Sequence, residues 1–455
     1  MLFNSYTFLF GFLPAVLAGY FILNRFRLFT CAKLWLALAS LVFYGWWNLR
    51  YIPLILTSIL FNYRIGQRMH SGRIRPRALL VFGLSANLLL LGYYKYADFF
   101  ITNWNGLAGG NIAALHLLLP LGISFFTFTQ IAYLVDAYRQ QVREYSLVSY
   151  ILFVTFFPHL IAGPILHHKE MMPQFDRLRG KLWNWSNVLS GSLLFCIGLG
   201  KKVVIADTLA GYANSGFASA AHMVDSWAAV LSYTLQIYYD FSGYTDMAIG
   251  IALLFNIRLP QNFNAPYRAV SVRDFWQRWH ITLSRFLRDY IYIPLGGNRT
   301  GFWTSIRNVM ATFLLGGLWH GAGWLFVLWG LLHGAGQAVE RIWLRRGLAV
   351  PPKWLAWLLT FVFLNITWVF FRAENISSAL RLLKGMSGLN GIGLAAAGEL
   401  KWNALFILLL LGIILWRPQA PVRVRGWTTV VAMALIFIFS LFFFNRITPF
   451  LYFNF

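Results

Sequence analysis

Acidic side chains are scarce in this sequence of 455 residues. Fourteen aspartates and glutamates stand against 38 lysines and arginines, and charged residues make up 11% of the chain. A soluble protein carries roughly twice that charged fraction. A positive excess in a soluble chain would suggest nucleic acid, but here the basic residues lie in short loops between apolar runs, where they set membrane orientation. We therefore expect no nucleic-acid partner.

Cysteine is rare, with two residues, and the common catalytic motifs are missing. Cys31 and Cys196 belong to no CxxC pair or metal-spaced cluster, so we predict neither a disulfide nor a zinc site. His167, His168 and Glu170 resemble a metal cluster, but adjacent histidines do not share a helix face, so we expect no metal there. GLGKK lacks the first glycine of a P-loop, and no acceptable GxGxxG or GxSxG occurs. We expect no metal, no nucleotide fold and no serine-hydrolase machinery.

Long apolar runs are what the sequence has in abundance. Hydrophobic residues form 59% of the chain, and runs of membrane-spanning length recur at 3–23, 78–96, 353–371 and 427–444. This pattern predicts an all-α polytopic membrane protein with about eleven transmembrane helices plus re-entrant and interfacial helices. Because the spans are spread evenly, we expect one membrane domain over residues 1–455, surrounded by membrane lipid.

Basic loops predict the topology of these spans. The arginines of NRFR (24–27) and of 64–77 should lie in the cytoplasm, which puts the N-terminus outside. The first span lacks a basic leader and a small-residue cleavage site, so we expect it to be retained. Counting the later spans also delivers the aromatic tail, residues 445–455, to the outside.

The middle of the chain is less regular. After a predicted span at 117–135, Gly163 and Pro164 interrupt an apolar run, which predicts a re-entrant or broken helix within 156–170. Further spans are expected at 186–200 and 226–256.

One amphipathic segment stands out between the spans. Over residues 271–290, aromatic and aliphatic side chains fall on one arc at helical spacing, and arginines and aspartates fall opposite. Asp274–Arg278 and Arg285–Asp289 have the spacing of ion pairs on one helix. We predict a single amphipathic helix lying at the cytoplasmic membrane interface.

The stretch GLWHGAGW (317–324) places a histidine in apolar surroundings. His320 follows Asn308 by twelve residues, which is about 18 Å into a hydrocarbon core of roughly 30 Å. An ionisable group at that depth is a functional candidate. The flanking glycines allow another chain or a ligand to approach, and Trp319 could wall a cavity. The alternative is a histidine that hydrogen-bonds across a helix interface.

Three further features could support chemistry. His280 lies at the edge of the amphipathic segment's apolar arc, as a packed histidine or a catalytic one. Asp240 and Asp246 lie inside an apolar span, where they could orient a histidine, neutralise a buried arginine or form a structural polar cluster. The tail FLYFNF ends the chain, and its aromatic residues are typical of a membrane-interface anchor.

Several long, ordered blocks resemble a known family. They are MLFNSYTFLFGFLP, AGPILHHKEMMPQF (162–175), LGKKVVIAD (199–207), QIYYDFSGYTDMAIGIALLFNI (236–257), LPQNFNAPYRAVSVRDFWQRWHITLSRFLRDYIYIPLGGNR (259–299) and GGLWHGAGW (316–324). The sequence resembles the membrane-bound O-acyltransferase family, in the bacterial branch that exports acetyl groups for polysaccharides such as alginate and peptidoglycan.

The resemblance implies a fold and a set of site residues. The fold would be a helical ring around a central tunnel in the bacterial inner membrane. His320 would be the catalytic histidine and His280 a supporting one. Asp240 and Trp319 are expected to support them because of the positions described above, independently of the resemblance. Tyr452, in the terminal aromatic motif, would accept the acyl group on the outer side.

The resemblance also implies a reaction. Acetyl-CoA would enter from the cytoplasm, and His320 would act as general base while Tyr452 attacks the thioester. A periplasmic acyltransferase of the SGNH-hydrolase type would take the acetyl group to a polysaccharide acceptor. An acetyl-histidine intermediate is the alternative route, and the residues do not separate one polysaccharide from another.

Two other functions fit part of the sequence. The related D-alanyl branch transfers its acyl group from a carrier protein to teichoic acid. A non-catalytic transporter could instead use Asp240 and Asp246 as a proton path.

Overall fold

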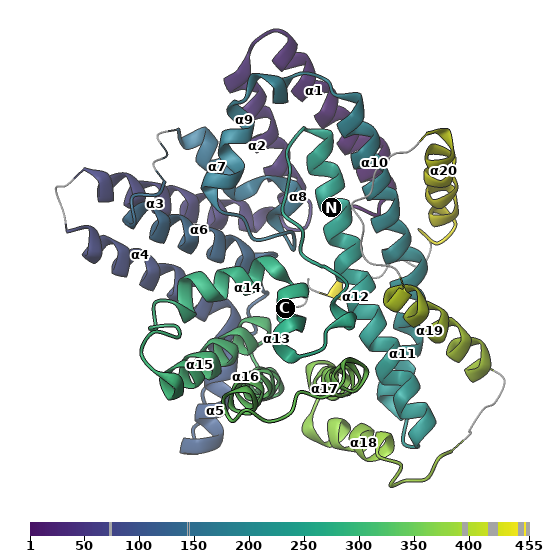
Figure 1. Ribbon diagram of the computed structural model, residues 1–455. Coiled ribbons are helices and arrows are strands. Elements are labelled where there is room, and N and C mark those ends of the chain that lie inside the picture. Colours follow the sequence, from purple (N-terminus) through teal and green to yellow (C-terminus); the bar gives the residue numbers. More distant parts are fainter. Residues whose placement is uncertain are drawn as a thin grey trace. The chain divides into compact units, whose positions relative to one another are not determined.

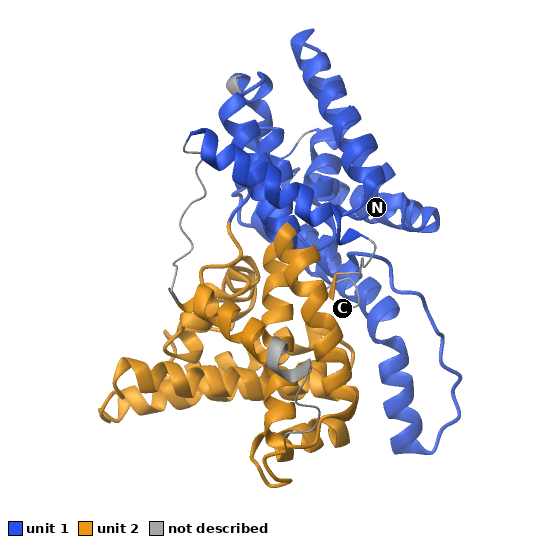
Figure 2. Ribbon diagram, turned by 90° about the vertical axis from the view of Figure 1, so that its right-hand side faces the viewer, with its two compact units in different colours: residues 1–199, 244–260, 422–444 blue, residues 200–243, 261–421, 445–455 orange. Residues whose placement is uncertain are grey.

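The computed structural model describes the whole chain apart from residues 72–74, 143, 145, 394–398, 417–425, 445–449 and 452–455. Every regular element in this part is helical, which confirms the all-α prediction. The chain forms two compact units, drawn in different colours in Figure 2. Unit 1 holds residues 1–199, 244–260 and 422–444, and unit 2 holds 200–243, 261–421 and 445–455.

Unit 1 consists of helices from the first half of the chain, the last part of α12 Met223–Leu254 and one late helix, α20; Figure 1 labels them. Its α-helices are α1 Leu13–Arg25, α2 Phe29–Gly45, α3 Ile52–His70, α4 Pro76–Leu91, α5 Ala97–Ala108, α6 Ile123–Tyr138, α7 Leu147–Thr155, α8 Phe157–Leu160, α9 His168–Asp176, α10 Trp185–Leu199 and α20 Trp427–Leu441. Short turns are η1 Thr7–Phe12, η2 Leu49–Tyr51, η3 Gly92–Tyr96 and η4 Leu178–Lys181.

A buried amide cluster joins three helices of unit 1. The side chain of Asn62 on α3 donates to Gln130 on α6 at 2.9 Å, and Asn87 on α4 donates to Asn62 at 2.6 Å. All three side chains are buried. Helices in an apolar medium gain no hydrophobic stabilisation from each other, so such hydrogen bonds help to select which helices pair.

Two predicted boundaries in unit 1 have different outcomes. The broken helix within 156–170 is confirmed, because α8 ends at Leu160 and α9 begins only at His168. A β-carbon on Gly163 would lie 2.4 Å from the Cα of His159, so this turn requires glycine. The predicted span at 117–135 starts too early, because Pro120 and the left-handed Gly122 (φ +69°) delay α6 until Ile123.

Unit 2 contains the later helices and the start of the longest one. It holds η5 Gly200–Ala206, α11 Asp207–Ser219, the first part of α12 Met223–Leu254, η6 Pro266–Arg268, α13 Val272–Arg278, α14 Ile281–Leu287, η7 Arg288–Tyr292, α15 Phe302–His320, α16 Trp324–Arg345, α17 Lys353–Arg372, α18 Ile376–Met386 and α19 Glu399–Trp416. Among the described residues, four helical stretches are long and apolar enough to cross a membrane. The count of eleven spans stays a prediction.

Helices α15 and α16 form a hairpin whose backbones touch at two glycines. A β-carbon on Gly317 would lie 2.3 Å from the carbonyl oxygen of Phe326, and one on Gly330 would lie 2.3 Å from that of Phe313. The Cα of each glycine also lies 3.1 Å from the β-carbon position of the other. Gly317, one of the glycines that flank His320, therefore admits the neighbouring helix, which is one of the two alternatives that the sequence left open.

We expect Gly330→Ala to lower the thermal midpoint of the detergent-purified protein, because overpacking a helix contact costs about 1–3 kcal/mol. Gly323→Ala is the matched control. Its added β-carbon meets its nearest neighbour, Phe326, at an ordinary 3.7 Å. Equal midpoints for the two variants would show that the α15–α16 contact is looser than described.

Candidate active site

His320 is the last residue of α15 and is enclosed by aromatic rings. Its side chain is buried, with 1% of the residue exposed. The ring centroids of Trp319, Trp329 and Phe371 lie 4.9, 5.0 and 5.2 Å from that of the imidazole, all in edge-to-face geometry. This surface excludes water, so a proton held or taken by the imidazole is kept from bulk solvent.

The predicted amphipathic helix over 271–290 is wrong as a single helix. The chain forms α13 and α14, with Trp279 and His280 between them, and then the π-helical turn η7. The backbone of His280 is left-handed, with φ +43°, a conformation that ends a right-handed helix. The Asp274–Arg278 ion pair is confirmed at 2.7 Å, and Asp289 contacts Arg288 at 2.7 Å.

Asn262 holds this break in place. Its backbone carbonyl accepts the N–H of Ile281 at 3.0 Å, and its side-chain oxygen accepts the N–H and the hydroxyl of Thr282 at 3.2 and 2.8 Å. The same oxygen lies 3.2 Å from Nδ1 of His280. Because an amide oxygen can only accept hydrogen bonds, Nδ1 of His280 must be the donor. His280 therefore carries its proton on Nδ1, and its Nε2 has a lone pair.

His280 is neutral and lies close to the enclosure of His320. The residue is fully buried, and this burial lowers its pKa to about 3. Its ring lies 4.7 Å from Phe241 and 6.1 Å from Trp319, measured between centroids. Since Trp319 also contacts His320, at 4.9 Å between ring centroids, the two histidines flank one tryptophan.

Burial of neutral His280 predicts a pH dependence of stability. Below pH 6.5 His280 is protonated in the unfolded chain but stays neutral in the native protein. The free energy of unfolding therefore includes the full contribution of His280 above that pH and decreases as the pH drops. For this one group, the change in the free energy of unfolding approaches about 1.4 kcal/mol per pH unit. We expect the thermal midpoint of His280→Asn to fall less between pH 7.5 and 5 than that of the wild type.

Asparagine tolerates the left-handed backbone of residue 280, which makes it the suitable replacement. His222→Asn, at a half-exposed histidine, serves as the control and should keep the wild-type pH response. A wild-type response in His280→Asn as well would mean that residue 280 protonates equally in the folded and unfolded states.

Asp240 belongs to a buried ionic cluster, which we call the buried triad: Lys202, Asp207 and Asp240. The ammonium of Lys202 lies 2.6 Å from Asp240 and 2.9 Å from Asp207. The three side chains are 1%, 4% and 3% exposed. The sequence left three roles open for Asp240, which were to orient a histidine, to neutralise a buried arginine or to belong to a structural polar cluster. Its partner is a lysine, carried on the π-helical turn η5, an element often found at functional sites.

The C-terminal tail meets the buried triad. The backbone N–H of Leu451 donates to the second oxygen of Asp240 at 2.9 Å. Phe450 is buried, and the ammonium of Lys202 lies 4.6 Å from its ring centroid. Tyr452, the predicted acyl acceptor, lies outside the described residues. Leu451, which immediately precedes Tyr452, is thus hydrogen-bonded to Asp240, a predicted supporting residue.

The predicted residues fall into two connected groups within unit 2. One group contains His320, Trp319 and His280, and the other contains Asp240 and the tail. Phe241, which follows Asp240 in the chain, contacts His280 and so connects the two groups. Sequence reasoning missed Asn262, Lys202, Asp207, Trp329 and Phe371. The first three lie inside blocks that were quoted for the family resemblance, which was the available signal. Across the described residues, no three histidine, cysteine or acidic side chains gather as metal ligands do.

Comparison with known proteins now decides the family. The sequence model of the membrane-bound O-acyltransferase family matches residues 47–379. The chain belongs to this family. A peptidoglycan O-acetyltransferase of Helicobacter pylori is 51% identical over 429 residues, which cover 87% of this chain and 81% of the relative. A probable alginate O-acetylase of Pseudomonas aeruginosa is 42% identical over 399 residues, covering 85% and 75%.

A more distant relative represents the D-alanyl branch. The teichoic acid D-alanyltransferase of Bacillus subtilis is 28% identical over 221 residues, which cover 45% of this chain and 55% of the relative. The similarity to O-acetyltransferases is therefore both stronger and longer. As a member of the family, the protein is a membrane-embedded acyltransferase.

Proposed function

We propose that the protein is an O-acetyltransferase that moves acetyl groups from acetyl-CoA on the cytoplasmic side of the inner membrane to an extracytoplasmic polysaccharide. His320 is the general base and Tyr452 is the acyl acceptor. The observation that carries this proposal is the environment of His320, a buried imidazole at a helix end, enclosed by three aromatic rings and linked through Trp319 to neutral His280.

The first step is acyl transfer from sulfur to oxygen. The phenol oxygen of Tyr452 attacks the thioester carbonyl while His320 takes the phenol proton, which is needed because an ordinary tyrosine has a pKa of about 10. The C–S bond breaks and the imidazolium protonates the departing thiolate. The products are free coenzyme A and an acetyl-tyrosine ester, with His320 neutral again.

The second step passes the acetyl group to a partner. A serine hydroxyl of a periplasmic acyltransferase of the SGNH-hydrolase type attacks the acetyl-tyrosine ester, and the phenol of Tyr452 is regenerated. The partner then acetylates the polysaccharide. The names of the two similar O-acetyltransferases, one of peptidoglycan and one of alginate, support an acceptor of this class.

The enclosure of His320 places a requirement on this reaction. A residue that is 1% exposed is reached by a thioester only if one of the surrounding rings rotates. Phe371 closes one side of the imidazole and also packs edge-to-face against Phe326. We therefore assign substrate entry to a movement of the aromatic side chains around His320 rather than to a permanent opening at the ring.

The test is acetyl transfer onto the protein itself. We expect wild-type protein in proteoliposomes, given radiolabelled acetyl-CoA, to carry label on Tyr452. His320→Ala should lower the rate of labelling by about 10²-fold or more, since general-base assistance is worth 10²–10⁴-fold. Tyr452→Phe should abolish labelling, and both variants should abolish polysaccharide acetylation in cells.

His320→Gln and the surface control His222→Ala complete this experiment. The glutamine variant keeps a polar, planar side chain, so an unchanged thermal midpoint with lost labelling separates chemistry from folding. Label on His320 in Tyr452→Phe would favour the acetyl-histidine route. Wild-type labelling in His320→Ala would refute the proposed function.

A further inference from the structure

We propose that the buried triad is the anchor that holds the C-terminal tail and so positions Tyr452; this inference rests on the proposed function. A buried carboxylate needs a hydrogen-bond donor at each of its two oxygens. Asp240 therefore has one oxygen on the Lys202 ammonium and a second that needs a further donor. The tail supplies that donor, the N–H of Leu451.

The tail is held by two contacts of different kinds. Besides the hydrogen bond to Asp240, the ring of Phe450 lies under the Lys202 ammonium at 4.6 Å. A cation over an aromatic face is attracted to it, more strongly where water is absent. Both contacts fall on the two residues that immediately precede Tyr452, so they restrict where residue 452 can lie. The triad thus acts on the reaction through position and does not touch the reacting atoms.

The test removes the donor without altering the triad. Leu451→Pro lacks the N–H that Asp240 accepts, and Leu451→Ala keeps it. Each is combined with Phe455→Cys in a chain whose own cysteines, Cys31 and Cys196, are changed to serine. We expect maleimide to label residue 455 of the proline variant roughly tenfold faster than that of the parent, as loss of one charge-assisted hydrogen bond predicts. The alanine variant should match the parent.

Asp240→Asn provides a second route to the same measurement. It weakens the acceptor from the triad side, so it should also speed labelling of the tail. Equal labelling rates in all variants overturn the anchor, whatever happens to acetyl transfer. Faster labelling with unchanged acetyl transfer overturns the positioning role of the triad. Failure of the Tyr452 relay itself is detected separately, as acetyl transfer that persists in Tyr452→Phe.

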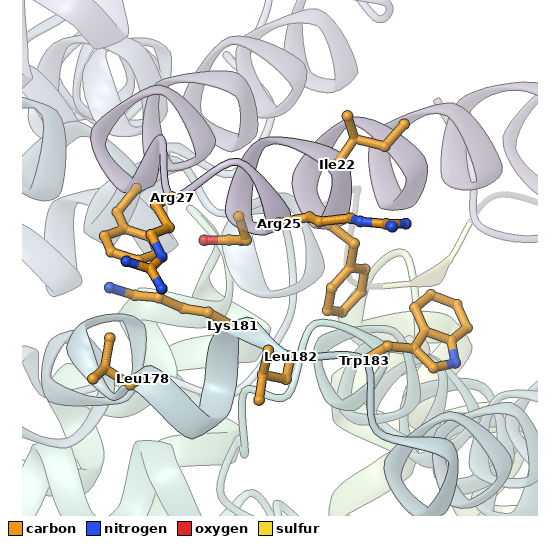
Figure 3. A pocket seen from close by; sticks show the side chains of 10 residues that line it. Ile22, Arg25, Arg27, Leu178, Lys181, Leu182 and Trp183 are labelled. Atoms are coloured by element: carbon orange, nitrogen blue, oxygen red, sulfur yellow. The ribbon is translucent and has the colours of Figure 1, made fainter.

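A different observation in unit 1 carries a second inference. A cavity of about 910 Å³ lies where α1 ends, and Figure 3 shows Arg25, Arg27 and Lys181 along it with Leu182 and Trp183. No carboxylate is among the residues that line the cavity. Burial and nearby Lys33 lower the pKa of Lys181, against the opposing effect of Asp176. Concentrated positive charge of this kind is stabilised by an anion.

We infer that this cavity binds the phosphate-bearing headgroup of an anionic phospholipid. The apolar helix Thr7–Arg25 is long enough to cross a membrane, so its end lies at the level of the headgroups. Exposed Ile22, Leu178 and Leu182 line the same cavity and offer apolar surface to acyl chains. Basic pockets with adjoining apolar surface are typical of anionic lipid sites.

Native mass spectrometry of the delipidated full-length protein tests this site with phosphatidylglycerol and phosphatidylcholine as probes. We expect preference for phosphatidylglycerol, and an affinity loss on the order of a hundredfold in Arg25→Gln/Arg27→Gln/Lys181→Gln. The control Arg50→Gln/Arg346→Gln/Lys353→Gln removes three exposed cations elsewhere. Equal losses in both triple variants, or occupancy by coenzyme A with no lipid preference, would overturn the proposal.

Discussion

An ionised or strongly polar side chain in an apolar interior must find its partner within the protein, and this constraint organises both units. Lys202 is surrounded by two carboxylates, and the remaining oxygen of Asp240 takes a hydrogen bond from the tail. His280 stays neutral and meets Asn262. In unit 1, three amides join α3, α4 and α6. Each polar group thereby specifies a contact that apolar packing alone leaves open.

The helix hairpin α15–α16 determines the surroundings of His320. The two glycines bring the backbones into contact, and His320 follows three residues after Gly317, at the turn of the hairpin. Trp329, on the opposite helix, then lies against the imidazole. The close approach of the helices is what brings an aromatic wall to the histidine, so the glycines serve the site by shaping the protein around it.

The sequence was sufficient for the helical class, the broken helix within 156–170 and the burial of His320, because these follow from hydropathy and from glycine and proline. It was insufficient where a tertiary contact overrides a local pattern. Residues 271–290 have helical periodicity throughout, but four interactions with Asn262 stabilise a left-handed His280 in their midst. Lys202 was missed because a lysine in an apolar run reveals neither its depth nor its distant partners.

The contact between Asp240 and Leu451 has a consequence for biosynthesis. Leu451 follows Asp240 by 211 residues, so this donor is synthesised well after both Lys202 and Asp240. Until residue 451 has left the ribosome, the second carboxylate oxygen of Asp240 lacks this main-chain donor. A premature stop codon before residue 451 therefore removes a hydrogen bond from the interior of the protein, far from the site of the mutation in the sequence.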